Sequence, residues 1–461
     1  MTDDGMTARW FLLRRFILGA LAVVVFTAGT QGHAFAQEPL TLDEAIARGV
    51  KYSARLAELE ARRAGTVAAE AGRAAAKLPV AALQGGYTRT NHVDEFIIPT
   101  LGQAPRLLYP DVPNNYRARL DLQWPIYTAG RADALERAAH AEVSAVVEDI
   151  EAARADLKLE ITRAYWALVT ARETETVVAR SVASLDAHIK DLQSRLEQGL
   201  IPPNEVLTAQ AQRSREQVLS IESANSRAVA EADLRRLIGA DRGEILNLPA
   251  DAASRSQAPN VPPSARIGPE QTKTATATSD PERAERRALG QRLKAAQERE
   301  AATAAGAKPQ LFVAGGYDYA RPNPRIFPRA DRWEDSWDAS VNVSWTLWDG
   351  GRRRAEQAEA AAAARAIESR ITELDREVAF EVEARGLELD SARAAIAAAD
   401  EGIRSALEAR RVIGERYQAG VVTSTDVLDA ELAVLQAQLD RTRALASARL
   451  AEARLERALG R

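Results

Sequence analysis

The sequence predicts a mainly α-helical fold with a smaller β part, built from a strand–strand–helical-hairpin unit that occurs twice. Three observations predict it: an internal repeat, two stretches of apolar–polar alternation, and two helical stretches of unusual length. The repeat begins at Trp124, which recurs 221 residues later as Trp345, and ends at Gly239, which recurs as Gly460. No insertion interrupts the match, so the two copies have kept the same physical length.

The composition of the 461-residue chain favours long helices over two or three compact globular domains. Aromatic residues make up 5% and charged residues 27%, and alanine and arginine are abundant, as in solvent-flanked helices. The formal net charge of -4 is too balanced to indicate a nucleic-acid partner. The sequence contains no cysteine, so we expect no disulfide, thiol catalysis, cysteine metal site or lipoprotein anchor.

Residues 1–36 have the three-part pattern of a secretory signal peptide. A pair of arginines precedes an apolar run over 16–26, and a small-residue cleavage site stands before Gln37. Either Met1 or Met6 can be the true start. The apolar run is too short to span a bilayer, and no later stretch reaches spanning length. We therefore expect an exported protein that enters a membrane, if at all, with strands.

The repeat divides the mature chain into three parts. We expect a first repeat unit over 37–241, a linker over 242–280 that is rich in proline, alanine, serine and threonine, and a second repeat unit over 281–461. The first unit should open with one helix over 41–77. A strand over 79–90 and a polar, proline-rich loop should follow that helix. The second unit should likewise open with a helix from 281 to about 306 and a strand over 310–319.

Two further strands alternate between apolar and polar residues. They span 116–126 and 337–347, so each has one apolar and one polar face. Aromatic residues stand near the strand ends, and the face opposite the apolar one is polar or charged. This pattern favours outer-membrane barrel strands that turn the apolar face to lipid. A soluble sandwich, in which the apolar face meets a second sheet, is the alternative.

Each of these strands leads into a helix far longer than those of ordinary domains. Residues 131–198 contain neither glycine nor proline and would reach on the order of 100 Å as one helix. Residues 352–419 match them, and shorter helices over 204–238 and 425–459 follow after a glycine break. Leucines with coiled-coil spacing mark the last helix: Leu428, Leu432, Leu435 and Leu439.

Together these features resemble the TolC family of outer-membrane efflux proteins. The resemblance is carried by LTLDEA at 40–45, by LQWPIY at 122–127, by WTLWDGGR at 345–352, and by the hairpin turns at 199–207 and 420–428. Each piece is common on its own, but their order, doubled at fixed spacing, is specific. The resemblance covers nearly all of the mature chain.

The resemblance implies a homotrimer in the outer membrane. Three chains would each give four strands to a twelve-stranded β-barrel, and their helices would form an α-helical barrel across the periplasm. The strands themselves agree, because four strands cannot close a barrel and open edges are not permitted in lipid. The resemblance further implies the exit duct of a tripartite efflux or type I secretion system. Such a duct docks a periplasmic adaptor, works with an inner-membrane pump and conducts cargo passively.

The two hairpin turns are the candidate docking site for the adaptor, by resemblance. Their residues are Gly199, Leu200 and Ile201 in the first copy and Gly420, Val421 and Val422 in the second. An exposed apolar turn at the end of a polar hairpin is unusual unless something covers it. The alternative is that these residues only reverse the chain, with glycine supplying a left-handed cap. Pro202-Pro203 has no counterpart in the second turn, so the two tips need not be equivalent.

A second candidate site is a pore constriction on the long helix of the second copy. The family carries acidic residues a few turns before the second tip, and here Glu408 lies twelve residues before Gly420. Arg411 stands one helical turn further on, so a ring of both residues would be internally paired and less cation-selective. Glu401 and Glu415 are alternatives. The other interpretation of Glu408 is a solvated charge on an exposed helix face.

No cofactor, metal site or catalytic set is expected. The four histidines, His33, His92, His140 and His188, lack metal-ligand spacing and are interpreted as scattered surface residues. No nucleophile–base arrangement, phosphate loop or carboxylate pair stands out. Two other function classes remain: a periplasmic adaptor or structural coiled-coil protein, and an exported enzyme on a helical scaffold. The sequence does not identify the cargo, which can be drugs, metal ions or polypeptides.

Overall fold

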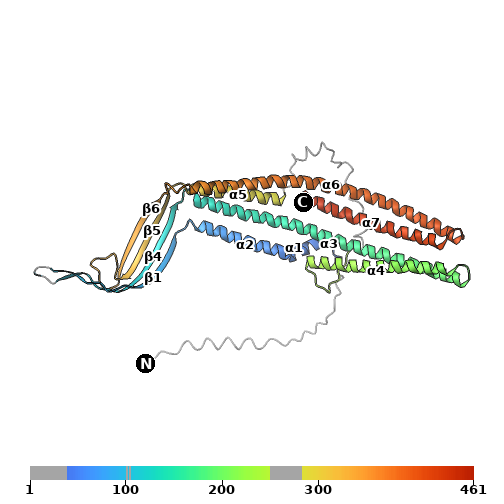
Figure 1. The fold of residues 1–461 in the computed structure, drawn as a ribbon, viewed down its shortest axis with the longest axis horizontal. Coiled ribbons are helices and arrows are strands. Elements are labelled where there is room, and N and C mark those ends of the chain that lie inside the picture. Colours follow the sequence, from blue (N-terminus) through green and yellow to red (C-terminus); the bar gives the residue numbers. More distant parts are fainter. Residues whose placement is uncertain (1–38, 100–101, 103–104, 250–282) are drawn as a thin grey trace, which may run out of the picture. The chain divides into compact units, whose positions relative to one another are not determined.

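The computed structural model describes residues 39–99, 102, 105–249 and 283–461, and Figure 1 shows its ribbon. The chain divides into two units, Met1–Pro39 and Leu40–Arg461, and the elements described below belong to the second. The expected signal peptide and most of the expected linker lie outside the described residues. Within those residues, no helix is both long enough and apolar enough to cross a membrane.

Four strands form one antiparallel sheet in the order β1–β4–β5–β6. Their bounds are Val80–Arg89 for β1, Asn114–Tyr127 for β4, Gln310–Arg321 for β5 and Glu334–Ser344 for β6. Val80 pairs with Gln123, and Gln310 pairs with Ser344, so all four strands meet the helices at the same end of the sheet (Figure 1). The sheet of one chain is open, with β1 and β6 at its edges.

The two faces of this sheet differ as the alternation predicts. On the apolar face, Leu120, Leu122 and Trp124 of β4 are 48%, 44% and 44% exposed. On the polar face, the register places Arg119 beside Asp318 of β5, whose side chain is only 2% exposed. The polar side chains therefore satisfy one another across the strands, whereas the apolar ones are left uncovered in the single chain.

Two helical hairpins carry the repeat. Helices α3 (Arg131–Glu197) and α6 (Arg352–Gln418) each run for 67 residues without a break. Helices α4 (Pro203–Ile238) and α7 (Ser424–Ala458) return along them after tight turns. The predicted helices are confirmed to within one residue at each end. High alanine content and the absence of interior proline explain their continuity.

The two hairpins pack against each other mainly through α3 and α7. The predicted leucine seam is confirmed, because Leu428 joins a buried cluster with α3 and α4, and Leu435 packs with Val177 and Val178 of α3. Nearer the sheet, α5 (Ala284–Ala305) contacts both α3 and α6. The repeat copies therefore hold each other along most of their length.

Ion pairs fix the place where α5 and α7 meet. The side chain of Arg457, near the end of α7, is 9% exposed, and its Nε donates to Asp156 of α3 at 2.9 Å. The same guanidinium contacts Glu285 in the first turn of α5. Arg283, which caps α5, donates from Nη1 to Glu381 of α6 at 2.7 Å. A buried arginine held by two carboxylates specifies how these helix ends are positioned.

One expected helix is wrong in the structure. The single helix expected over 41–77 is two helices, α1 (Leu42–Tyr52) and α2 (Ala54–Ala75). Ser53 between them has an extended backbone, and its hydroxyl accepts a hydrogen bond from the Leu56 amide at 3.3 Å. A serine that caps a new helix in this way interrupts the old one, although the hydrophobic pattern continues across it.

The strands also depart from the expected pattern. The strand expected over 337–347 ends at Ser344, because its partner β5 begins opposite that residue and offers later residues nothing to pair with. The stretch expected as a loop contains a small ribbon, β2 (Phe96–Ile98) paired with β3 (Arg106–Tyr109). The β preference of branched and aromatic side chains in these segments outweighs the tendency of the flanking prolines to form a loop.

The described start of the expected linker, residues 242–249, is fixed onto the helices. Leu246 is buried, and the Leu40 amide donates to the Asn247 carbonyl at 2.6 Å. Arg48 of α1 binds Glu244 with Nη1 and Oε1 2.8 Å apart. These contacts join residues 40–48 to the described start of the expected linker.

Gly239, which ends α4, allows a direct test of this packing. Its φ is +65°, and an added Cβ would lie 2.8 Å from Cβ of Tyr52. Gly199 has a φ of +74° with open space around it. We expect Gly199→Ala to cost about 1–2 kcal/mol of left-handed strain, and Gly239→Ala to cost more because Tyr52 must also move. Thermal unfolding followed by circular dichroism measures both; equal midpoints for the two variants would contradict the packing.

Candidate functional site

The first hairpin tip is a left-handed turn between α3 and α4. Gly199 has a φ of +74°, which places its amide 2.9 Å from the Leu196 carbonyl and the Leu200 amide 2.9 Å from the Arg195 carbonyl. These bonds satisfy the last carbonyls of α3, as in a Schellman motif. Leu200 is left 68% exposed at the apex, whereas Ile201 turns inward against a buried cluster.

The second tip repeats this geometry between α6 and α7. Gly420 has a φ of +73°, and the Val421 amide donates to the Arg416 carbonyl at 2.9 Å. Val421 is 72% exposed at the apex, and Val422 is half-buried. Each tip therefore presents one outward apolar side chain on a chain reversal of the same shape.

The tips differ only after the apex. Pro202 and Pro203 start α4, and Pro203 needs no amide partner because it has no N–H. In the second tip, Thr423 and Asp426 form a capping box at the start of α7, with the Thr423 amide 2.8 Å from Oδ2 of Asp426. The two sequences thus solve the same capping problem differently without changing the turn.

A buried cluster anchors both tips to each other. Leu192 of α3, Val206 of α4 and Leu428 of α7 form its centre, with Ile201 and Tyr417 packed at its edge. Sequence reasoning missed Tyr417, which lies in the last turn of α6 and meets His188 of α3 with ring centroids 5.8 Å apart. An aromatic residue three positions before the turn glycine was the available signal.

His188 is not the surface histidine that the sequence suggested. It is partly buried, and its Nε2 is buried without a hydrogen-bond partner among the described residues. Burial lowers the pKa of His188 below the ordinary 6.5, outweighing the opposing influence of the nearby carboxylates Asp191 and Glu431. The histidine is therefore neutral at neutral pH, packed between the two hairpins.

We expect the packing at the tips to weaken in acid. Below about pH 6.5 an opened His188 takes up a proton while the packed one does not, so the free energy of opening falls with pH down to the folded pKa. Hydrogen–deuterium exchange of the tip amides, corrected for intrinsic rates, should accelerate between about pH 7.5 and 5.5. His188→Gln should remove this dependence, and an unchanged pH slope in that variant would contradict it.

The candidate constriction residues lie on an exposed face of α6. Arg411 binds Glu408 through Nε (3.0 Å) and Nη2 (2.7 Å), and Glu415 through Nη1 (2.5 Å). The Arg411 guanidinium lowers the pKa of Glu408. Glu401 makes a separate pair with Arg404. Glu408 and Arg411 are thus paired within one chain, as the sequence led us to expect, and the three-residue group carries one net negative charge.

Two further histidines contact carboxylates, and His33 lies outside the described residues. Nδ1 of His92 lies 2.6 Å from Asp111, and Nδ1 of His140 lies 2.8 Å from Glu70. Across the described ranges, no three histidine or acidic side chains come together as a metal site would require.

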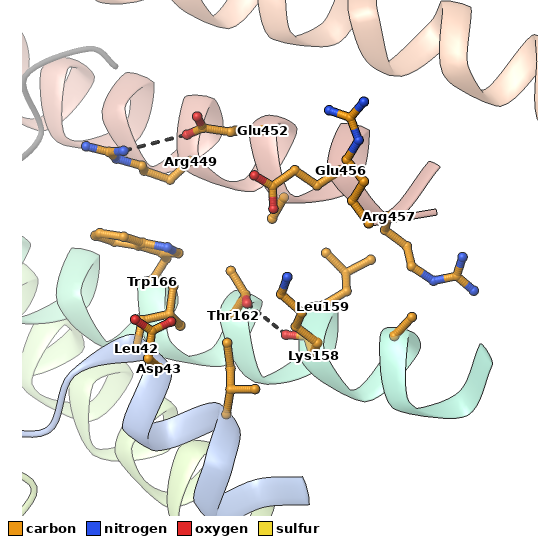
Figure 2. A pocket seen from close by; sticks show the side chains of 14 residues that line it. Leu42, Asp43, Lys158, Leu159, Thr162, Trp166, Arg449, Glu452, Glu456 and Arg457 are labelled. Carbon is orange, nitrogen blue, oxygen red and sulfur yellow. Dashed lines mark hydrogen bonds and ion pairs between the residues drawn. The ribbon is translucent and has the colours of Figure 1, made fainter. Parts of the chain in front are cut away.

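A pocket of about 230 Å³ lies between α1, α3 and α7 (Figure 2). The guanidinium of Arg449 stands 5.4 Å from the ring centre of Trp166 and pairs with Glu452 at 3.6 Å. Figure 2 shows Lys158 and Asp43 facing the same space from α3 and α1. The lining carries charged side chains of both signs and comes from both repeat copies.

The family of the chain follows from its match to a known family pattern. The pattern of the outer membrane efflux protein family matches residues 41–240 and 282–461. This chain belongs to that family. The two matched segments contain the two copies of the repeat, and residues 1–40 and 241–281 are not matched.

A curated relative and several solved structures agree with this membership. Protein CyaE of Bordetella pertussis is 27% identical over 367 residues, which cover 73% of this chain and 70% of CyaE. The crystal structure of CusC matches with a TM-score of 0.76 at 15% identity, covering 92% of each chain. VceC of Vibrio cholerae matches with a TM-score of 0.71 at 19% identity, covering 91% of this chain and 96% of VceC. The solved structures establish the fold of this outer membrane efflux protein.

Proposed function

We propose that this outer membrane efflux protein is the exit duct of a tripartite efflux or type I secretion system. It works as a homotrimer, docks a periplasmic adaptor at its helical tips and conducts cargo passively out of the cell. Energy comes from an inner-membrane pump. The barrel lies in the outer membrane of a Gram-negative type cell, and the helices extend into the periplasm.

The open sheet is the observation that carries this proposal. Strands β1 and β6 have unpaired edges, while Leu120, Leu122 and Trp124 expose apolar surface on one face. Three copies joined edge to edge give a closed twelve-stranded barrel, which removes the free edges and turns the apolar face to lipid. The paired charges of the opposite face then line the water-filled lumen.

The tips support the docking part of the proposal. Leu200 and Val421 are the apex residues of two turns with matching φ angles, and both side chains are more than two-thirds exposed. Apolar side chains held outward by rigid turns fit an apolar partner surface better than water. Ile201 packs against the buried cluster behind the first apex, and Val422 is half-buried.

Glu408 and Arg411 form the proposed constriction of the duct near the tips. In a trimer, the Glu408, Arg411 and Glu415 side chains of the three chains would form a ring with a small negative charge, because each arginine offsets one of two carboxylates. Such a ring predicts weak cation preference. Replacing Arg411 by glutamine should strengthen that preference in reversal-potential measurements.

The arrangement of the hairpins does not favour the alternative function of a periplasmic adaptor. That class carries one hairpin inserted in a small barrel domain, whereas here two hairpins each follow directly from a strand of one sheet. Fractionation separates the two functions. The duct should run as heat-modifiable trimers in the outer-membrane fraction, while a soluble or inner-membrane pool would contradict it.

A further inference from the structure

The polar face of the sheet carries a pocket that the channel proposal does not use. This arginine pocket has a volume of about 280 Å³ and lies in the half of the sheet remote from the helices. Its charged lining consists of Arg117, Arg119 and Arg329, and the acidic residues Asp and Glu are missing from its lining. The uncharged polar residues of the lining are Gln84, Thr88, Asn115 and Tyr116, and glycine, alanine and proline residues complete it.

A buried carboxylate fixes two of the three guanidinium groups. Asp318 accepts from Nε of Arg117 at 2.5 Å, and its other oxygen contacts Nη1 of Arg119. Arg119 also binds Asp121 at 2.6 Å and Asp338 at 3.3 Å, so its donors are largely used. Gly316 makes this possible, because a Cβ there would lie 2.3 Å from Nη2 of Arg119.

Two cations of the pocket keep unused binding capacity. Arg117 donates to Asp318 through Nε alone, and its terminal nitrogens make no hydrogen bond to any described residue. Arg329 donates to the Tyr109 hydroxyl at 2.8 Å and lies 5.0 Å from that ring centre, without an ion pair in the described ranges. A guanidinium with free, co-directed N–H groups is suited to an oxyanion.

The space beside Arg117 is kept open by glycine. Gly86 of β1 is the cross-strand neighbour of Arg117 on the polar face, and no atom lies within 4 Å of its added Cβ. Because the pocket volume exceeds that of a few water molecules, a phosphate or carboxylate group can enter between Arg117 and Arg329.

We propose that the arginine pocket binds an oxyanion group, phosphate or carboxylate, of a solute on the polar side of the sheet. A phosphate group can come from a free solute or from a lipid headgroup, and the solute is favoured because the lipid-facing apolar side chains lie on the opposite face. The assignment of the anion to a solute rests on the proposed channel, because the channel makes the polar face the lumen. The binding of an oxyanion by the arginines does not depend on the channel.

A second basic pocket on the same face supports this ligand class. It lies where the sheet meets the helices and is lined by Arg131, Arg299, Lys308, Arg352 and Arg353, with Glu356 as its acid. Three of these cations bind carboxylates, whereas Arg131 and Lys308 make no ion pair with a described residue. Cationic groups with unused donors therefore stand at both ends of the polar face.

Calorimetric titration of the purified trimer with inorganic phosphate tests the proposal. We expect saturable binding by the wild type, and a loss of about tenfold in affinity for Arg117→Gln and for Arg329→Gln, because each removes a charged donor. Arg332→Gln, which removes a neighbouring arginine already paired with Glu334 outside the pocket, should bind like the wild type. Equal affinities for all four proteins, or no saturation up to about 10 mM phosphate, would overturn the proposal.

Substitutions at Gly86 test the pocket without removing an arginine. Gly86→Asp places a carboxylate opposite Arg117 and should abolish phosphate binding, whereas the neutral Gly86→Asn should keep it within about threefold. Phosphate binding that survives in Gly86→Asp trimers would overturn the proposal. Heat-modifiable trimers on gels show that each variant assembles.

Two further experiments distinguish a solute from a lipid as the source of the anion, and test the pocket separately from the channel. Affinity for phosphate should be equal in nanodiscs of zwitterionic and of anionic lipid; a loss in anionic lipid would overturn the assignment to a solute. Conductance is measured on the same samples. Trimers that conduct without binding phosphate would refute the pocket alone, and trimers that bind phosphate without conducting would refute the channel alone.

Discussion

Efflux is expected to disappear when Leu200 and Val421 are both replaced by aspartate, while trimers still assemble. Both side chains stand at the apex of a turn, 68% and 72% exposed, so the folded hairpins lose no buried contact. A pair of charges would instead enter the apolar contact with the adaptor, where each unpaired charge is costly. We expect no measurable export of a dye that wild-type cells expel.

The controls for this experiment separate docking from folding. The double variant Leu200→Met with Val421→Ile keeps the apex apolar and should export normally. Co-purification with the cognate adaptor should fail for the aspartate pair and succeed for the conservative pair. Normal export by the aspartate pair would refute the docking role, and loss of the trimer would show that the tips serve assembly instead.

Replacing Asp318 by alanine is expected to cause the largest loss of stability in the strand region. Its side chain is 2% exposed and holds Arg117 and Arg119 from the neighbouring strand. Removing Asp318 leaves Arg117 without its carboxylate partner and Arg119 with only Asp121 and Asp338, which costs about 1–3 kcal/mol. The temperature at which the trimer dissociates on gels should fall clearly.

A matched variant makes this result specific. Asp335→Ala removes the same group from an exposed position on β6 that makes no ion pair with a described residue. The dissociation temperature of that variant should stay close to the wild type. Equal losses in the two variants would contradict the role of Asp318, because they would reflect the change of net charge alone.

Much of the fold could be predicted because its signals are local and repeated. The absence of glycine and proline over 131–198 fixes α3, and Gly199 and Gly420 mark the turns. The break at Ser53 could not be predicted, because a capping hydroxyl competes with a helical pattern that continues on both sides. The early end of β6 depends on where β5 begins, which is a property of the pairing.

The candidate sites likewise divide into features with a local sequence signal and features that depend on contacts between distant residues. The tip residues follow from the repeat, and the pairing of Glu408 with Arg411 follows from their spacing on one helix. The contact between His188 and Tyr417 joins two residues that lie more than two hundred positions apart in the sequence. The arginine pocket likewise depends on strand register, which brings Arg117, Asp318 and Gly86 together from three strands. Neither arrangement has a local signature.

Single-channel recording in planar bilayers shows whether this protein forms a conducting duct. Purified heat-modifiable trimers should insert in discrete conductance steps of one size, with weak cation preference from the ring at Glu408 and Arg411. The aspartate pair at the tips should conduct as well as the wild type, because docking and conduction are separate functions. Trimers that reach the outer-membrane fraction but give no conductance steps would contradict the account of this protein as an exit duct.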